Sequence, residues 1–262
     1  MKPQKWGRTP FFSFGFALAV CALAACAPGQ HAYQPSVGQA GKDVVWVPTP
    51  QALVDTMLDM AKLRPEDYLI DLGSGDGRTV ITAARRGAQA LGIEYNAEMV
   101  ELSRRNAEQA GVGARAQFSR EDLFQADLSK ASVITMFLLP SINLKLRPRL
   151  LALKPGTRIV SNTFTMGDWE PDELTRLDRS HGCETSWCTA LLWIVPARVG
   201  GTHRMRAGEL TLKQTYQSLS GTLRSAGKTL PVEGKVPGEE VFLNAGGRAL
   251  YGKMNGTRLV IE

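Results

Sequence analysis

A glycine-rich turn follows a short apolar run and holds the residues best suited to chemistry in this chain. The stretch Leu69–Arg78 reads LIDLGSGDGR, with Asp71 inside the run and Gly73, Gly75 and Gly77 after it. This pattern predicts a buried strand that ends near a carboxylate, turns on the glycines and opens a helix. Glycine allows positive φ angles and close approach of a ligand, and the first turn of a helix offers unpaired N–H groups. We therefore expect a cradle here for the polar part of a nucleotide-like ligand.

The spacing of the glycines separates two classes of ligand. A dinucleotide-binding turn has the pattern G-x-G-x-x-G, which suits a pyrophosphate, whereas this chain has D-x-G-x-G-x-G followed by Arg78. A carboxylate at Asp71 would repel a pyrophosphate but suits a cationic amino group. S-adenosylmethionine (SAM) has an ammonium, a sulfonium and an adenosine, and it has no phosphate. The stretch resembles motif I of the class I SAM-dependent methyltransferases; an ordinary strand–helix turn is the alternative.

Two acidic positions further along extend the resemblance. The run 89–94 ends on Glu94, at the distance from the turn that one helix and one strand require. A carboxylate there accepts hydrogen bonds from both ribose hydroxyls, and a solvated acid is the alternative. In methyltransferases an acid and an apolar residue after the third strand hold adenine, which indicates Asp122 and Leu123, with Glu121 as the rival acid and a surface turn as the alternative. The cofactor-binding residues that the resemblance implies are Asp71, Gly73, Ser74, Gly75, Asp76, Gly77, Glu94, Asp122 and Leu123.

Apolar runs and turn signals around these residues predict a layered α/β fold. Strands are expected at 68–72, 89–94, 114–118, 132–139 and 157–164, with helices between them and a first helix near 50–61. The fourth run is apolar throughout, as a strand buried on both faces of a parallel sheet should be. Two more strands, at 174–179 and 187–195, would close the sheet as an antiparallel hairpin. We expect a Rossmann-like, seven-stranded class I methyltransferase sheet with five parallel strands and that hairpin.

Short segments in a fixed order suggest one branch of this superfamily. They are Val47–Pro50, Asp71–Arg78, Gly92–Glu94, Asp122–Leu123, Phe137–Pro140, Gly156–Ser161 and Trp193–Pro196. Together they resemble the family that includes the mitochondrial ATP synthase c-subunit lysine methyltransferase, over residues 44–196. The resemblance implies an enzyme that transfers the sulfonium methyl of SAM to a nucleophile, with a protein lysine as a candidate acceptor.

The acceptor side of the site has fewer signals. Open α/β sheets place their chemistry at the carboxyl ends of their strands, so Phe137, Pro140 and Asn143 are candidate lining residues of the acceptor slot. His181 and His203 fall in predicted loops, and no catalytic residue is assigned. The sequence shows no metal-ligand spacing.

The N-terminus has the pattern of an export signal. The first ten residues contain Lys2, Lys5 and Arg8 and no acid, and residues 11–25 are almost wholly apolar. That run is shorter than the ~20 residues of a membrane span and fits the apolar core of a signal peptide. We therefore expect a signal peptide over residues 1–25.

The end of the signal indicates a lipid anchor. Leu-Ala-Ala-Cys26 resembles the lipobox of bacterial lipoproteins, in which the cysteine is acylated. Ordinary signal cleavage nearby and an uncleaved anchor are the alternatives. Residues 26–43 are polar and rich in Gly, Pro and Gln, and they predict a flexible tether. The expected location is the periplasm or cell envelope, with the protein attached to the membrane through Cys26.

The pattern changes again from residue 208. Alternating residues with Gly or Pro turns predict a small antiparallel β meander or barrel over 208–262, after a linker at 197–207. A region of about 55 residues has a thin core of its own, so we expect it to dock on the methyltransferase domain. Cys183 and Cys188 lie before it. Export permits a disulfide between them, and a small buried side chain at Cys188 is the alternative.

Charge and composition limit the partners. The chain has 31 Lys and Arg residues against 25 acids, and removal of the signal would leave a net charge of about +3, too mild to argue for nucleic acid. Two functions remain: a SAM-dependent methyltransferase, and an exported non-enzymatic envelope module that keeps the fold. SAM is made in the cytosol, which keeps the second open. The complete set of glycines and carboxylates in the turn favours the first. The sequence gives no oligomeric state.

Overall fold

The computed structural model of the chain describes residues 1–4, 7, 33–206 and 208–261. The predicted lipid attachment at Cys26 and all of the predicted signal peptide except residues 1–4 and 7 lie outside these residues. The described residues from Tyr33 onward form one compact unit. Within the described part of the chain, no helix combines the length and the apolar character that crossing a membrane would need.

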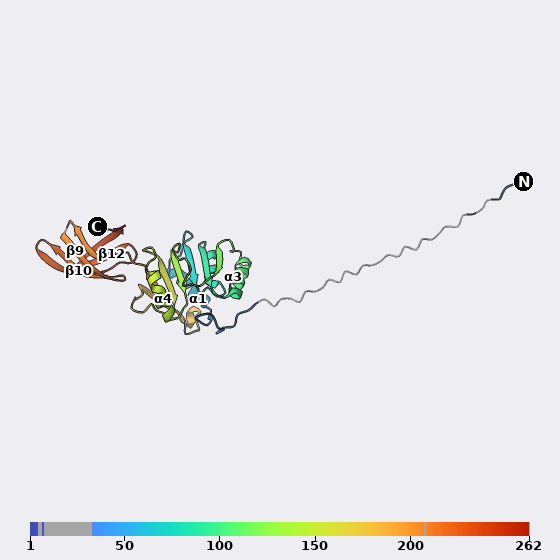
Figure 1. Cartoon of the computed structure of the whole chain (residues 1–262), viewed down its shortest axis with the longest axis horizontal. Helices are drawn as coiled ribbons and strands as arrows, with labels where there is room; N and C mark the ends of the chain where they lie inside the picture. The colour runs from blue at the N-terminus through green and yellow to red at the C-terminus, as the bar shows by residue number, and fades with distance from the viewer. Residues whose placement is uncertain (5–6, 8–32, 207, 262) are drawn as a thin grey trace. The chain divides into compact units, whose positions relative to one another are not determined.

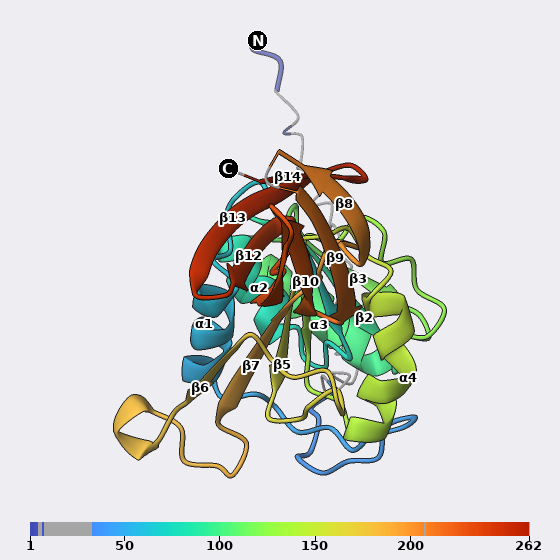
Figure 2. The same ribbon diagram turned by 90° about the vertical axis from the view of Figure 1, so that its left-hand side faces the viewer.

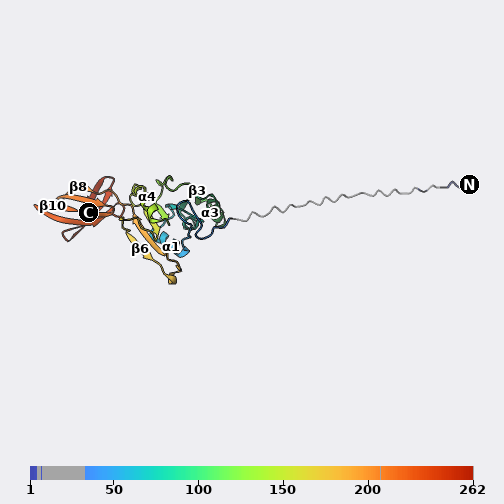
Figure 3. The ribbon, with the colours of Figure 1, turned by 60° about the horizontal axis from the view of Figure 1, so that its bottom comes forward.

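The first sheet has seven strands in the order β3-β2-β1-β4-β5-β7-β6, with β3 and β6 at its edges (Figure 3). Strands β1 to β5 are parallel, and β7 lies antiparallel to both β5 and β6. The strands are β1 (Tyr68–Leu72), β2 (Gln89–Glu94), β3 (Ala116–Arg120), β4 (Val133–Met136), β5 (Arg158–Asn162), β6 (Glu173–Arg176) and β7 (Thr189–Ile194). This arrangement confirms the predicted Rossmann-like sheet of five parallel strands closed by an antiparallel hairpin.

Four helices cover this sheet. They are α1 (Gln51–Met60), α2 (Arg78–Arg85), α3 (Ala97–Gln109) and α4 (Pro140–Leu150). Figure 2 shows α1 and α4 on opposite sides of the strands β5 and β7. Helix α3 begins where Asn96 accepts hydrogen bonds from the N–H groups of Glu98 and Met99, which is the usual chemistry of an N-terminal cap.

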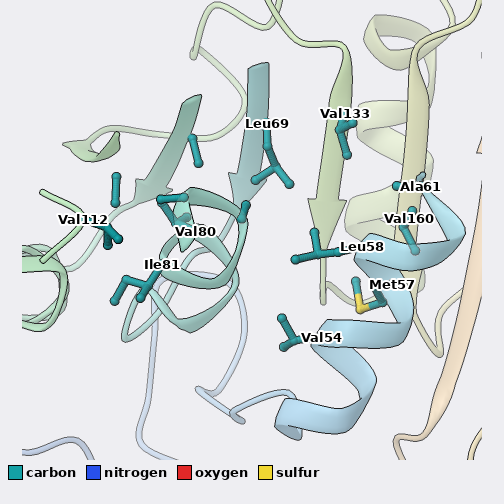
Figure 4. Packing of buried hydrophobic residues seen from close by; sticks show 14 of the residues in the cluster. Val54, Met57, Leu58, Ala61, Leu69, Val80, Ile81, Val112, Val133 and Val160 are labelled. Carbon is teal, nitrogen blue, oxygen red and sulfur yellow. The ribbon is translucent and has the colours of Figure 1, made fainter. Parts of the chain in front are cut away.

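Each face of the sheet has its own hydrophobic cluster. Leu58 of α1 belongs to one cluster with Leu69 of β1 and Val133 of β4 (Figure 4). Leu146 of α4 belongs to the other, with Ile134 of β4. Successive side chains of a strand point to opposite faces, so a strand covered on both sides needs apolar residues on both. The run VITM of β4, buried at all four positions, meets that need.

Several element boundaries differ from the predictions. Strands β4 and β5 end at Met136 and Asn162, earlier than the predicted ends at 139 and 164. Strand β3 begins two residues late, because Arg115 and Ala116 still donate hydrogen bonds to Val112 in the turn after α3. The hairpin strand β6 ends at Arg176, and a short 3₁₀ helix at Arg179–His181 follows it. Strand β7 begins at Thr189, since Trp187 and Cys188 belong to a disulfide-closed loop.

The second sheet is an antiparallel meander at the C-terminal end of the chain (Figure 1). Its strands follow chain order as β8 (Gly201–Met205), β9 (Gly208–Thr215), β10 (Ser218–Ser225), β11 (Lys228–Lys235), β12 (Glu240–Ala245), β13 (Arg248–Asn255) and β14 (Arg258–Ile261). The all-β appendage is thereby confirmed. The predicted linker is wrong in one respect, because β8 lies inside it and pairs with β9. The sequence of β8, GTHRM, has no apolar alternation that would indicate a strand.

The turn between β9 and β10 docks the appendage on the first sheet. The indole N–H of Trp169 donates to Oε1 of Gln217 at 3.0 Å, and the amide of Gln217 donates to the carbonyl of Glu170 at 2.7 Å. The ring of Tyr216 stacks on Trp169, and its hydroxyl donates to Asp168 at 3.1 Å. Since Trp169 is fully buried, this contact joins the two cores.

A buried carboxylate ties the start of β1 to β5, and its loss is expected to destabilise the fold. Asp67 is paired with the guanidinium of Arg158 and accepts from the hydroxyl of Ser132 at 2.7 Å and from the N–H of Arg64 at 2.7 Å. Burial raises the pKa of Asp67, but these hydrogen bonds outweigh it and lower the pKa overall. Removal of one partner of such a pair leaves the other charge unpaired, so Asp67→Ala should lower the free energy of unfolding by about 3 kcal/mol in urea titrations at pH 7.

The pH dependence and a neighbouring residue provide the checks on Asp67. Because the folded-state pKa lies below the unfolded one, the stabilisation exists above the unfolded pKa and disappears as the pH falls through the folded one. Glu66→Ala is the matched control: its ion pair with Arg64, at 3.9 Å, lies in solvent, and no measurable change is expected. Equal stability of the Asp67→Ala variant and the wild type at pH 7 would contradict the assignment.

Candidate active site

A cavity of about 530 Å³ opens at the carboxyl ends of the parallel strands. The turn after β1, the end of β2 and the segments after β3, β4 and β5 all contribute to its lining, together with residues 39–49. In open α/β sheets ligands bind at this edge, where the connections leave the strands. The topology therefore gathers the ends of five strands around one cavity.

The glycine turn adopts the conformation that its sequence predicts. Gly73, Gly75 and Gly77 have φ angles of +77°, +56° and +82°. Gly73 and Gly75 line the cavity, whereas a Cβ on Gly77 would lie 2.8 Å from the ring of Phe118. Gly77 therefore serves the packing at the start of α2.

Two polar side chains of the same turn, those of Ser74 and Asp76, differ in their hydrogen-bond partners. Ser74 lines the cavity, and its buried hydroxyl has no hydrogen-bond partner among the described residues. The carboxylate of Asp76 also lines the cavity but is held by the guanidinium of Arg78 at 2.6 Å. A buried hydroxyl without a partner is costly, so a ligand that bonds to Ser74 would relieve that cost. The turn thus fits the polar ligand that motif I implies.

Asp71 is a buried acid at the floor of the cavity. The hydroxyl of Thr135 donates to its Oδ1 at 2.7 Å, and no basic side chain pairs with it in the described ranges. Burial raises the pKa of Asp71 to about 7 against the opposing effect of Thr135, and the carboxylates of Glu94 and Asp76 add to the rise. A ligand with a positive charge would supply the missing partner.

Glu94 ends β2 with its carboxylate between two backbone donors. The N–H of Gly75 donates to Oε2 at 3.0 Å, and the N–H of Asn96 donates to Oε1 at 2.9 Å. Glu94 also lines the cavity, and each carboxylate oxygen can accept more than one hydrogen bond. The side chain can therefore fix the glycine turn and accept from ligand hydroxyls at the same time.

The predicted adenine end of the cavity is covered by residues before α1. Asp122 and Leu123 line it, and the ammonium of Lys42 lies 2.6 Å from Asp122 and 4.7 Å from the ring centroid of Tyr95. The hydrogen bond from Lys42 lowers the pKa of Asp122. Glu121, the rival acid, lines the cavity too. The end of the predicted 26–43 tether thus contacts the site, which no local signal in that polar segment indicated.

The acceptor-side candidates are separated by the structure. Phe137 lines the cavity. Pro140 is exposed at the first turn of α4, outside the lining residues. Asn143 is buried beneath the site, where its amide donates to the carbonyls of Phe164 and Thr165 at 3.2 Å. Of the first residues of α4, Ile142 lines the cavity, whereas Pro140 and Asn143 do not.

Two aromatic residues beside Phe137 were missed by the sequence reasoning. Phe164 follows β5 and Trp187 precedes β7, and both line the cavity. The ring centroids lie 5.9 Å apart for Phe137 and Phe164, 6.1 Å for Phe137 and Trp187, and 5.3 Å for Phe164 and Trp187. We call these three residues the aromatic trio. Their only sequence signal is an aromatic residue at the end of an apolar run.

His181 and His203 lie away from the cavity. His181 is an exposed residue whose Nδ1 lies 2.8 Å from the carboxylate of Asp178, and Nε2 of His203 lies 2.7 Å from the carbonyl of Val199. Neither lines the cavity. Within residues 33–206 and 208–261, no group of three or more His, Cys, Asp or Glu side chains is placed to hold a metal ion.

Comparison with known proteins identifies the ligand class. Residues 71–173 match the model of the ANTKMT methyltransferase domain. The chain is 43% identical over 138 residues to a protein-lysine N-methyltransferase of Saccharolobus islandicus, which covers 52% of this chain and 86% of that protein. It is 31% identical over 189 residues to the ATP synthase c-subunit lysine N-methyltransferase of Mus musculus, which covers 72% of this chain and 74% of that protein.

A solved structure agrees with these relatives on fold and cofactor. The crystal structure of an RNA methyltransferase from Salinibacter ruber, in complex with S-adenosylhomocysteine (SAH), superposes with a TM-score of 0.54 at 46% identity. The match covers 58% of this chain and 96% of that one. The comparisons give no support to a non-enzymatic envelope module. The protein is a SAM-dependent enzyme, and it belongs to the class I methyltransferases, in the family of the ATP synthase c-subunit lysine methyltransferase.

Proposed function

We propose that this enzyme methylates the side-chain amine of a lysine in a protein. The observation that supports the proposal most directly is the aromatic trio, which lines the cavity beside the glycine turn. Aromatic faces attract ammonium groups and pack against alkyl chains, and a lysine side chain has both. Two relatives named as protein-lysine methyltransferases point to the same acceptor.

The cofactor side of the cavity is suited to SAM. When bound, SAM supplies a methyl group that is already activated by its sulfonium. Asp71 offers a buried negative charge to the ammonium, Glu94 offers acceptors to the ribose, and Leu123 offers an apolar surface to adenine. The hydroxyl of Ser74 remains free for one more polar contact.

The acceptor side would favour a lysine in its neutral form. A protonated amine has no lone pair, so the lysine must lose its proton before it can react. Desolvation in the slot disfavours the charged form and lowers the pKa of an amine, and it opposes the cation–π attraction that first draws the ammonium to the aromatic trio. No histidine lies among the described lining residues, and we infer that the proton leaves to solvent as the side chain enters.

The test compares protein and RNA as acceptors, because one similar structure is that of an RNA methyltransferase. The full-length enzyme is incubated with tritiated SAM and either a cell-envelope protein fraction or total RNA. The proposal expects label in methyl-lysine after acid hydrolysis of the protein. Label that enters RNA nucleosides and leaves the protein fraction empty would contradict it. Glu94→Ala serves as the inactive control.

The affinity for SAM should depend on pH through Asp71. Ionised Asp71 pairs with the ligand ammonium, so binding lowers its pKa from about 7 and affinity decreases as the pH falls below that value. Between pH 7.5 and pH 6 we expect a decrease of about tenfold in equilibrium dialysis. A second decrease should begin near pH 8, where an α-amino group loses its proton. Adenosine has no amino acid portion and serves as the control, because its affinity should not change across this pH range. Equal pH profiles for SAM and adenosine would contradict the assignment.

The enzyme acts outside the cytosol, attached to the membrane through Cys26. The lipobox-like Leu-Ala-Ala-Cys26 supports this location. The disulfide between Cys183 and Cys188 also supports it, because disulfides persist in oxidising compartments. Metabolic labelling with an alkynyl palmitate should mark the wild type and leave Cys26→Ser unmarked. Equal labelling of both proteins, or of neither, would contradict the lipid anchor.

A further inference from the structure

We propose that the loop closed by the Cys183–Cys188 disulfide sets the affinity of the acceptor slot, with Trp187 as the outer wall of that slot. The proposal rests on the proposed lysine methylation and adds to it a specificity-determining residue, Trp187, and two positioning residues, the cysteines. The slot would take a primary amine on a long alkyl stem.

The disulfide fixes the loop on both sides of Trp187. Its two Cα atoms lie 6.0 Å apart, and both cysteines are buried. The carbonyl of Cys188 accepts a hydrogen bond from the N–H of Leu177 at 2.8 Å, which continues the pairing beyond β7. The N–H of Trp187 donates to the hydroxyl of Thr185 at 3.2 Å, inside the loop. The N–H of Cys183 donates to the carbonyl of Asp178 at 3.1 Å, and the disulfide adds a covalent cross-link between the two ends of this short loop.

Phe164 and Phe137, the other members of the aromatic trio, are held in place without the disulfide. The carbonyl of Phe164 accepts from the hydroxyl of Ser161 at 2.8 Å and from the amide of Asn143 at 3.2 Å. Thr163, which precedes it, has a φ of +61°, a conformation that few residues other than glycine adopt, and this turn aims Phe164 into the cavity. Phe137 directly follows the central strand β4. Two walls are thus set by the sheet, and the third depends on the loop.

Trp187 has the exposure expected of a wall at the mouth of a slot. The residue is 37% exposed, although its ring centroid lies 5.3 Å from that of Phe164. A large aromatic side chain left partly in water is available to an incoming ligand. If the loop is fixed in advance, less conformational freedom is lost when the acceptor binds. Opening the disulfide should therefore weaken acceptor binding and leave the cofactor side unchanged.

The experiment measures binding to the SAH-loaded full-length enzyme, in detergent, of two small probes. Nα-acetyl-lysine methylamide contains the amine, and Nα-acetyl-norleucine methylamide is the same stem without it. The indole N–H signal of Trp187 in ¹⁵N NMR, assigned from Trp187→Phe, reports the contact. The variants are Trp187→Ala, Trp187→Phe and the double variant Cys183→Ser/Cys188→Ser.

The proposal expects a defined pattern of affinities. The lysine probe should bind Trp187→Ala roughly tenfold more weakly, in line with the loss of one cation–π face, and Trp187→Phe should restore most of this. The double cysteine variant should bind the lysine probe roughly threefold to tenfold more weakly. SAH affinity should stay within about twofold in all three, because SAH binds on the side of Asp71 and Glu94. Dithiothreitol reduces the Cys183–Cys188 disulfide to two thiols and is itself oxidised to a cyclic disulfide. It should therefore weaken probe binding to the wild type and leave probe binding to the double variant unchanged.

Two results would overturn the proposal, and a third separates it from the proposed function. If the double cysteine variant or Trp187→Ala binds the lysine probe with wild-type affinity, the loop does not form part of the slot. A parallel loss of SAH affinity would show that the loop supports the whole site, which also overturns the proposal. If the wild type binds both probes equally, lysine methylation fails as the function; if it prefers the lysine probe and the variants keep that affinity, the loop inference alone fails.

Discussion

Asp71→Asn is expected to reduce the affinity for SAM by about 10- to 100-fold while the protein becomes no less stable. Asparagine keeps the oxygen that accepts from Thr135 but removes the negative charge that the cavity offers to the ligand ammonium. The dependence of SAM affinity on Asp71 ionisation below pH 7 should disappear with it. Equilibrium dialysis with tritiated SAM measures both effects.

The stability of the same variant should change in the opposite sense. A carboxyl whose pKa rises from 3.8 to about 7 on folding binds more protons in the folded state, so the free energy of unfolding of the wild type decreases as the pH rises through that interval. The asparagine variant carries no such charge. At pH 8 it should be more stable than the wild type by about 1–4 kcal/mol, and the two should converge near pH 4.

Asp127→Asn provides the matched control for Asp71→Asn. Asp127 is exposed and lies outside the cavity lining, so its variant should keep wild-type affinity for SAM. Unchanged SAM affinity in a folded Asp71→Asn protein would show that the buried carboxylate does not meet the ligand. A loss of stability at pH 8 would contradict the raised pKa.

Glu94→Ala should have the largest effect on the cofactor site, with SAM affinity lower by about 100-fold or more. The substitution removes the acceptor for the N–H groups of Gly75 and Asn96 and the oxygens available to the ribose. Glu94→Gln keeps one carbonyl oxygen, so its SAM affinity should lie between those of the wild type and Glu94→Ala. The rise in Tm on addition of SAH, large in the wild type and absent in Glu94→Ala, is the measurement.

A nearby acid separates the role of Glu94 from a general loss of charge. Glu98 lies four residues later in the first turn of α3 and is exposed, outside the cavity lining. Glu98→Ala should lower the Tm of the free protein slightly, through the helix dipole, and keep the full rise with SAH. If SAH raises the Tm of Glu94→Ala as much as that of the wild type, Glu94 does not bind the ligand.

The meeting of Asp71, the glycine turn and Glu94 at one cavity was predictable because the signals of these residues are local. The glycine turn, Asp71 and Glu94 each sit at the end of a strand, and the lengths of one helix and one strand fix their spacing. The alternation of apolar runs and turns likewise predicted the order of elements, and the structure departs from it by a few residues at boundaries. Strand β8 was missed because its residues lack alternation and its pairing with β9 decides its conformation.

The acceptor half depends on contacts between distant residues, which sequence patterns do not show. Phe137, Phe164 and Trp187 come from three different connections that meet because β4, β5 and β7 are neighbours in the sheet. Asn143 was expected in the slot and instead supports Phe164 from below. Lys42 reaches Asp122 across 80 positions, and neither residue's surroundings indicate the other.

The most direct test of this account is a crystal structure of the full-length enzyme with SAH. We expect SAH in the cavity at the carboxyl edge of the first sheet, its ribose hydroxyls bonded to Glu94, its amino group facing Asp71 and its adenine against Leu123. The sulfur should face the aromatic trio, where the acceptor amine would arrive. SAH bound elsewhere, or in this cavity with its sulfur turned away from Phe137, Phe164 and Trp187, would contradict the assignment of both halves of the site.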